Sequence, residues 1–264
     1  MCAWNNHICT GLYADLIQRV TGSLQLTTPC FVVHTSSGCY YIYKINFVQV
    51  FITMCALNKV KGMWVYMNQN YHKLCLEEIE KLKTTKKILL HSCCGPCSSY
   101  VISFLSNYFD ITILYYNPNI SPYEEYLKRK QEQIKLINNI ETKNKLNFLD
   151  IDYNYNEFKE FTKGLEQELE GGARCNKCFY LRLNKTCQLA KENKYDYFGT
   201  TLTVSPHKNA EIINNIGLQL EKDNNIKWLL SDFKKEDGYK KSIELSKKYE
   251  LYRQHYCGCE YSIY

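Results

Sequence analysis

Seven of the 14 cysteines of this chain fall into three short clusters. The clusters are HSCCGPCSS with Cys93, Cys94 and Cys97, RCNKC with Cys175 and Cys178, and YCGCEYS with Cys257 and Cys259. Neighbouring cysteines do not easily form a disulfide with each other, whereas several thiolates that converge on one point can bind a metal ion or an iron–sulfur cluster. HSCCGPC therefore suggests a metal site. The alternative is that Cys93 and Cys94 are small buried hydrophobic side chains.

The other two clusters leave more than one chemistry open. A C-x-x-C pair such as Cys175 and Cys178 can hold a metal, hold an iron–sulfur cluster or form a redox disulfide. Together with Cys93 and Cys94 it supplies four thiolates, which is the number needed by a [4Fe–4S] cluster or by a structural zinc ion. A disulfide between Cys257 and Cys259 would close a small strained ring, and strained disulfides are the redox-active kind. We favour a redox pair there over a pair of cluster ligands.

The chain shows no sign of export or of membrane insertion. The N-terminus lacks the pattern of a secretory signal, and the longest apolar run, residues 46–57, is shorter than the ~20 residues that span a bilayer. We expect a cytoplasmic location without membrane contact, where clustered cysteines serve metal or redox chemistry. The net charge of +6 permits nucleic-acid binding without demonstrating it.

From residue 86 onward, strand-like and helix-like segments alternate. The expected strands are 86–91, 111–117, 147–153, 195–201 and 226–232, and the expected helices are 97–107, 123–139, 176–193, 208–222 and 238–250. This alternation predicts an α/β fold with a mostly parallel sheet flanked by helices. In such sheets ligands bind beyond the carboxyl ends of the strands, and HSCCGPC follows the first strand.

Residues 1–66 differ from the rest of the chain. They contain four Lys or Arg and one Asp, and they show no clear period of 2 or 3.6. At Met67 an ordinary amphipathic helical pattern begins. We expect residues 67–264 to form the functional domain and residues 1–66 to be an extension, either an over-extended gene start or a poorly ordered segment. A small genuine N-terminal module is the alternative.

Five motifs in this order resemble the QueH-type epoxyqueuosine reductases. They are HSCCGPCSS, YYNPNISPYEEYLKRKQ, GGARCNKCFYLRL, FGTTLTVSPHKN and YRQHYCGCEYS, and they cover the chain from about residue 85 to its end. The resemblance implies a nucleotide-binding α/β fold of the HUP (Rossmann-like) class. It also implies reduction of epoxyqueuosine to queuosine at the wobble position of a tRNA, the last step of queuosine synthesis, without cobalamin.

The resemblance also assigns roles to residues. Cys93, Cys94, Cys175 and Cys178 would hold a [4Fe–4S] cluster, and Cys257 and Cys259 would be the redox-active pair. Cys97 is less defined, because it can ligate a second metal ion near the cluster or simply pack. An electron donor, which the sequence does not identify, has to supply the two electrons.

Histidine is the natural candidate for the proton donor, because it titrates near neutral pH. His207, in the polar SPHKN segment, is preferred over His91, which more simply reads as a strand-end histidine satisfied by backbone groups. The substrate has to be splayed out of the anticodon loop, so aromatic and basic residues are expected at the entrance. The candidates for these substrate contacts are Tyr116, Asn117, Tyr123, Arg129, Arg174, Arg182, Lys208 and Arg253.

Two other kinds of protein remain possible at this stage. A different tRNA-modifying enzyme of the nucleotide-binding α/β class would need a Gly-rich phosphate loop after the first strand, and HSCCGPCSS has one glycine only. A non-catalytic RNA-binding zinc module would be colourless and without redox activity.

Overall fold

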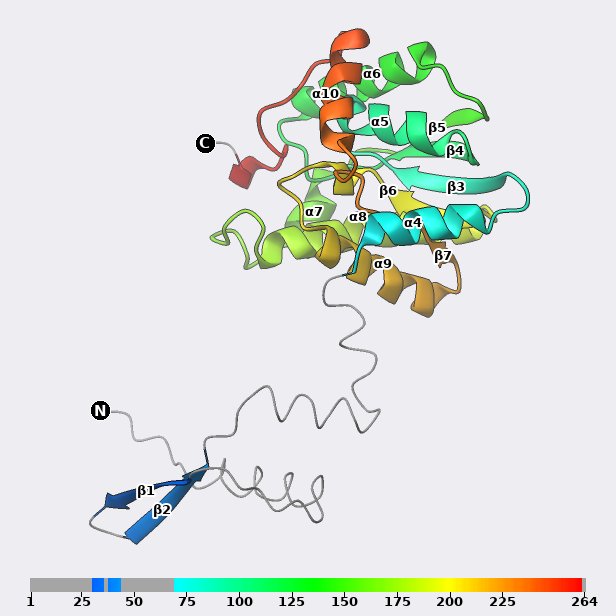
Figure 1. Cartoon of the computed structure of the whole chain (residues 1–264). Coiled ribbons are helices and arrows are strands. Elements are labelled where there is room, and N and C mark those ends of the chain that lie inside the picture. Colours follow the sequence, from blue (N-terminus) through cyan, green and yellow to red (C-terminus); the bar gives the residue numbers. More distant parts are fainter. Residues whose placement is uncertain (1–29, 36–37, 44–68, 263–264) are drawn as a thin grey trace. The chain divides into compact units, whose positions relative to one another are not determined.

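The structure, a computed structural model, describes residues 30–35, 38–43 and 69–262 (Figure 1). The chain divides into two units, Met1–Gln69 and Asn70–Tyr264. In the first unit, β1 (Cys30–Thr35) and β2 (Gly38–Tyr43) pair antiparallel, although the sequence shows no clear strand period there. The remainder of the expected extension, residues 1–29, 36–37 and 44–66, lies outside the described residues.

The second unit contains a five-stranded sheet in which every pairing is parallel. The strand order is β5–β4–β3–β6–β7. The strands are β3 (Lys86–His91), β4 (Phe109–Tyr115), β5 (Leu146–Asp150), β6 (Tyr197–Thr200) and β7 (Lys227–Trp228). The predicted α/β class with a parallel sheet is therefore confirmed.

Helices cover both faces of this sheet (Figure 1). They are α4 (Tyr71–Glu80), α5 (Gly95–Leu105), α6 (Tyr123–Asn139), α7 (Tyr155–Phe161), α8 (Ala173–Glu192), α9 (Ala210–Asn224) and α10 (Gly238–Lys248), with short 3₁₀ turns at Leu202–Val204 and Glu260–Ser262. The expected bounds of 123–139 are those of α6, whereas α7 was not predicted. None of the helices in the described part of the chain is long and apolar enough to cross a membrane.

The two faces of the sheet bury separate hydrophobic clusters. Ile88 and Leu90 of β3 pack into one cluster with residues of α5, α6 and α10, whereas Leu89 packs into the other with residues of α8 and α9. This alternation follows from the period of two along a strand, and full burial on both faces explains why β3 reads as an apolar run.

The strand order places a crevice beside the cysteine motif. The chain runs from β3 through β4 to β5 on one side, and then returns to β6 on the other side of β3. Ligands of such sheets bind where the order reverses, outside the carboxyl ends of the two central strands. Here these ends are His91 of β3 and Thr200 of β6, which are paired in the ladder.

Strand β7 is shorter than the predicted 226–232, because a side chain of α9 replaces the ladder. Asn214 donates from its amide to the carbonyl of Ser231 at 2.8 Å, and its Oδ1 accepts from the N–H of Ser231 at 3.1 Å. The same Oδ1 accepts from the indole N–H of Trp228 at 3.0 Å. A buried side chain thereby satisfies backbone groups that a longer strand would have paired.

Candidate active site and metal centre

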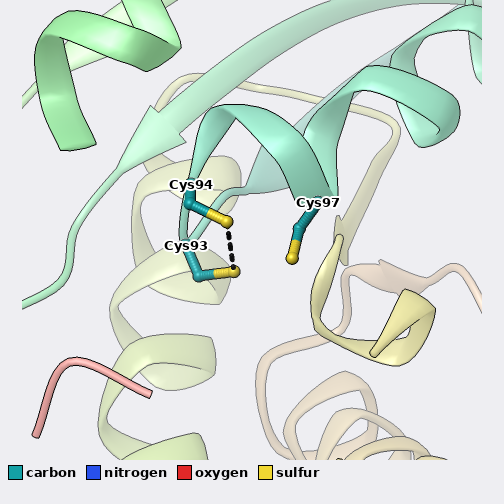
Figure 2. A group of neighbouring side chains, drawn as sticks. All are labelled: Cys93, Cys94 and Cys97. Carbon is teal, nitrogen blue, oxygen red and sulfur yellow. Dashed lines mark hydrogen bonds between the residues drawn. The ribbon is translucent and has the colours of Figure 1, made fainter. Parts of the chain in front are cut away.

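The connection from β3 to α5 brings three sulfur atoms together. Cys94 is the N-cap of α5, and Pro96 lies in the first turn, where a missing N–H is tolerated. The Sγ atoms of Cys93, Cys94 and Cys97 lie within 4.8 Å of one another, and those of Cys93 and Cys94 are 3.7 Å apart. Figure 2 shows the three side chains turned toward a common space at the start of the helix. We call them the cysteine trio.

One negative charge is favoured within the cysteine trio. Hydrogen bonds from the thiols of Cys93 and Cys97 lower the pKa of Cys94. The contact with Cys94 raises the pKa of Cys93, and the contacts with Cys93 and Cys94 raise that of Cys97. The N-terminus of α5 favours a thiolate at this position as well. The trio is thus a compact set of soft ligands of the kind that suits zinc, Cu(I) or iron–sulfur chemistry.

Helix α6 is hydrogen-bonded to the segment that carries the cysteine trio. Gln133 is fully buried, and its Oε1 accepts from the hydroxyls of Ser92 at 2.6 Å and Ser98 at 2.8 Å. Ser98 also bonds to the carbonyl of Cys94 at 2.8 Å. At Gly95 a Cβ atom would lie 2.9 Å from the carbonyl oxygen of Glu132, so the close approach of the two helices requires glycine there.

The four remaining clustered cysteines line a single cavity. Cys175 and Cys178 come from the first turns of α8, and Cys257 and Cys259 from the C-terminal segment. Burial raises the pKa of Cys178 to about 11 and that of Cys259 to about 12, so without a bound metal both are neutral thiols at neutral pH. The same cavity is lined by Phe158, Glu170, Gly171, Arg174, Phe179, Arg182, His207, Lys208 and Ser262.

Two cations face these sulfur atoms. Arg182 is 1% exposed, and its Nε donates to the carbonyl of Cys178 at 3.2 Å, while one terminal nitrogen has no hydrogen-bond partner. Lys208 is half-buried, and the nearby thiols of Cys257 and Cys93 raise its pKa although burial alone would lower it. An unpaired buried guanidinium nitrogen is costly, so the cavity is suited to an anionic group.

The expected four-ligand set is divided between the two groups. The cysteine trio contains Cys93 and Cys94, while Cys175 and Cys178 line the cavity. The two groups are neighbours, because the charge of Arg182 acts on the thiols of Cys178, Cys257, Cys93 and Cys175. Cys97, the least defined candidate in the sequence, is a member of the trio.

The Cys257–Gly258–Cys259 turn is held by a buried arginine of α6. Arg129 donates to the carbonyls of Cys257 at 3.0 Å and Tyr256 at 3.3 Å, and its Nε pairs with Glu125 at 2.6 Å. Gly258 has φ +108°, and a Cβ atom there would lie 2.7 Å from Nη1 of Arg129. Both Cys257 and Cys259 are free thiols. The turn therefore depends on glycine for its backbone and on Arg129 for its position.

A sequence model of the family described as "Epoxyqueuosine reductase QueH" matches residues 88–264, about two thirds of the chain. The chain belongs to the QueH family. Its named members are epoxyqueuosine reductases, so the predicted class of oxidoreductase is confirmed.

Curated QueH proteins match most of the chain. The QueH of Streptococcus pyogenes serotype M1 is 45% identical over 185 residues, covering 69% of this chain and 72% of that protein. The QueH of Staphylococcus epidermidis is 40% identical over 216 residues, covering 79% and 91%, and that of Thermotoga maritima is 34% identical over 179 residues, covering 67% and 90%. Residues 67–264 make up about 75% of the chain, so the Staphylococcus match includes residues before Met67.

His91 occupies a structural position in this QueH-family chain. It is fully buried, its Nε2 lies 3.1 Å from the carbonyl oxygen of Tyr116, and its Nδ1 lies 3.0 Å from the hydroxyl of Thr200. Burial lowers its pKa to about 3, so the ring is neutral. Since a carbonyl only accepts, Nε2 carries the proton and Nδ1 accepts from Thr200. His207, in contrast, is exposed and lines the cavity.

The predicted substrate contacts are distributed unevenly. Arg182 and Lys208 line the cavity. Asn117 is buried and donates to the carbonyl of Ser92 at 2.7 Å. Arg253 is half-buried, bonded to the hydroxyl of Ser246 at 3.0 Å, and is not among the residues that line the cavity. Arg129 is 2% exposed, so it lies on the buried side of α6.

Three supporting residues were not singled out in the sequence. Glu125 pairs with Arg129 across one helical turn, and an i, i+4 Glu–Arg spacing is a usable signal for that. Gln133 and Ser92 carry no such signal, because their role depends on the approach of α6 to the cysteine motif. Tyr116, Tyr123 and Arg174 were considered for the entrance; Arg174 lines the cavity, and it donates to the carbonyls of Leu165 and Glu166 at 3.1 and 3.0 Å.

Proposed function

We propose that this chain reduces epoxyqueuosine to queuosine at the wobble position of tRNA. Membership of the QueH family and a cavity lined by cysteines and by the cations Arg174, Arg182 and Lys208 support this proposal. The reaction removes the epoxide oxygen as water and consumes two electrons and two protons. A soluble donor in the cytoplasm has to provide the electrons.

Cys257 and Cys259 fit the electron count of this reaction. When a dithiol becomes a disulfide it releases two electrons and two protons, which is what the conversion of an epoxide to an alkene and water requires. Both thiols line the cavity. The donor then reduces the disulfide to restore the pair.

The residues present fit an iron–sulfur cofactor. Cys93, Cys94, Cys175 and Cys178 would hold a [4Fe–4S] cluster, with Cys97 available to a second metal ion, and a bound cluster supplies one-electron transfer. The unpartnered nitrogen of Arg182 supports this assignment, because a cluster with four thiolate ligands is anionic.

Three side chains of the cavity have roles toward the substrate. His207 is exposed at the cavity and can deliver a proton to the leaving oxygen. Lys208 and Arg182 hold positive charge where the oxygen atom gains negative charge during bond cleavage. His91, which is buried and neutral, orients the strand ends instead.

A nucleoside analysis tests the proposal. The full chain is expressed in a bacterium that lacks its own epoxyqueuosine reductase, and queuosine and epoxyqueuosine are quantified in digested bulk tRNA. We expect queuosine to return, and we expect a Cys257→Ser/Cys259→Ser variant to leave epoxyqueuosine. If the purified full chain is colourless, holds zinc and leaves epoxyqueuosine unchanged, a zinc-binding RNA module replaces the reductase.

The same assay tests the expected boundary at Met67. We propose that residues 67–264 carry the activity. If this shorter chain leaves epoxyqueuosine while the full chain restores queuosine, residues 1–66 belong to the functional protein.

A further inference from the structure

Six large hydrophobic side chains are exposed in the described part of the second unit. In residues 69–262 they are Tyr108, Tyr123, Leu127, Phe161, Leu169 and Tyr180. Tyr108 lies just before β4, at the amino end of the strands. The other five lie on α6, α7, α8 and the segment before α8, and these elements follow the carboxyl ends of β4 and β5 (Figure 1). Tyr123 and Leu127 lie on α6, which packs against one face of the sheet, whereas Phe161 and Tyr180 lie on α7 and α8, which pack against the other face.

Phe161 and Tyr180 are two members of this exposed group whose rings stack on each other. Their rings are stacked with centroids 6.1 Å apart and an interplanar angle of 5°. The side chains are 36% and 38% exposed. We call them the ring pair.

The ring pair lies on the outer side of the helices that form the cavity wall. Phe158, one turn before Phe161 on α7, lines the cavity. Cys178, two residues before Tyr180 on α8, also lines it. A molecule bound on the ring pair therefore contacts the same two helices whose residues line the cavity.

Lysines lie beside the ring pair, among carboxylates of the same stretch of the chain. The amine of Lys177 lies 5.8 Å from the ring centroid of Phe161, and Lys159 and Lys163 are exposed on the same segment. Lys163 pairs with Glu160 at 4.0 Å, so Lys177 and Lys159 are the cations left beside the rings. Of the other carboxylates, Glu166 accepts from the N–H of Gly164 and Glu168 from that of Ala173, whereas Glu157 and Glu170 lie in the same stretch. Flat exposed rings beside lysines bind the bases and phosphates of single-stranded RNA.

We propose that the ring pair is a stacking surface for a base of the tRNA anticodon loop, with Lys177 contacting the backbone. This inference rests on the proposed function, because the anticodon loop carries the wobble nucleoside. A neighbouring base stacked here holds the loop while the wobble base enters the cavity. The ring pair thus contributes to RNA affinity without touching the reacting atoms.

RNA binding tests the ring pair against a matched exposed tyrosine. The probe is a fluorescent RNA hairpin with the sequence of a tRNA anticodon arm and guanine at the wobble position. Binding to the full chain is measured by anisotropy for the wild type, the Phe161→Ala/Tyr180→Ala variant and Tyr108→Ala. We expect the double variant to bind about 10-fold or more weakly, the effect of losing one stacked base, and Tyr108→Ala to bind as the wild type does.

The salt dependence provides a second variant. Lys177→Gln removes one phosphate contact, so the slope of log affinity against log salt should fall by about 0.7, the value for one contact to single-stranded nucleic acid. An unchanged slope contradicts the role of Lys177. The three rings and the lysine are exposed, so melting temperatures should remain near that of the wild type.

Two outcomes separate this inference from the proposed function. If the double variant binds the hairpin as tightly as the wild type but converts epoxyqueuosine more slowly, the ring pair serves another partner, such as a protein electron donor, and the inference is wrong. If the wild type binds the hairpin through the ring pair but never forms queuosine, the surface stands and the proposed reaction fails.

Discussion

Two of the three cysteine segments of the site, HSCCGPC and YCGC, are positioned in different ways. In HSCCGPC, three sulfur atoms within five consecutive residues converge because β3 ends just before Cys93 and α5 begins between Cys94 and Cys97. In YCGC, two cysteines are held by a guanidinium that lies 128 positions earlier in the chain than Cys257. The first geometry follows from local backbone structure, whereas the second exists only after α6 and the C-terminal segment have packed together.

The largest effect is expected from a substitution in HSCCGPC, the segment whose geometry is set by local backbone structure. Cys94→Ser replaces a soft thiolate by a hydroxyl that is a poor ligand for iron, so we expect metal content and epoxyqueuosine reduction to fall by about 100-fold or more. Cys187→Ala is the matched control, since Cys187 is buried on α8 away from the cavity lining. Equal metal content in the Cys94→Ser variant and the wild type would remove Cys94 from the ligand set.

Arg129→Met removes the side chain that holds the Cys257–Gly258–Cys259 turn. This change leaves the carboxylate of Glu125, 12% exposed, without its partner and frees two carbonyls of the turn, at a cost of about 3 kcal/mol in the free energy of unfolding. We expect Cys259, which is buried, to become alkylated nearly as fast as Cys257. The measurement is peptide mass spectrometry after timed alkylation of the metal-free protein.

Arg253→Met is the control for that experiment. Arg253 lies four residues before Cys257 but bonds to Ser246 of α10. The ratio of the two alkylation rates should remain that of the wild type. A similar ratio in Arg129→Met would show that the turn keeps its position without Arg129.

Glycine substitutions separate backbone strain from crowding in the turn. Gly258→Ala places a Cβ atom at φ +108° and 2.7 Å from Arg129, whereas Gly164→Ala meets no atom within 4 Å at φ +81°. We expect Gly164→Ala to cost about 1–2 kcal/mol, from the strained backbone alone, and Gly258→Ala to cost more. Chemical denaturation measures both, and equal losses would mean that Arg129 gives way freely.

The smallest effect is expected when HSCCGPC loses its hydrogen bond to Gln133 of α6. Ser98→Ala removes the hydroxyl that bonds to Gln133, at about 1 kcal/mol in the free energy of unfolding. Metal content should stay unchanged, because the trio is fixed by the strand end and the first helical turn. Loss of metal in Ser98→Ala would show that the geometry of HSCCGPC also depends on its contact with α6.

The sequence was most informative where structure is local. The run KKILLH is β3 with the predicted bounds, because burial on both faces selects a continuous apolar segment. Helix α6 also has its predicted bounds. Helix α7 was missed, since seven residues with one fully buried side chain, Phe158, give little periodicity to detect.

The sequence indicated which types of residue form the site better than it indicated how those residues are arranged in space. Two of the three cysteine clusters line the cavity, whereas the burial of Arg129 and Asn117 could not be anticipated. An arginine in the segment EEYLKRKQ reads as a surface charge, and the acceptors that bury it, the carbonyls of Tyr256 and Cys257, lie far along the chain. Such partners become visible only when the fold is known.

Helix α6 is hydrogen-bonded to both HSCCGPC and YCGC. Arg129 and Gln133 occupy adjacent turns on the buried side of α6, the first bonded to the Cys257 turn and the second to the Ser92–Ser98 loop. Fluctuations of α6 therefore reach both segments at once. In hydrogen exchange, the amides of the two segments are expected to open as one cooperative unit, so that the site loosens or tightens as a whole.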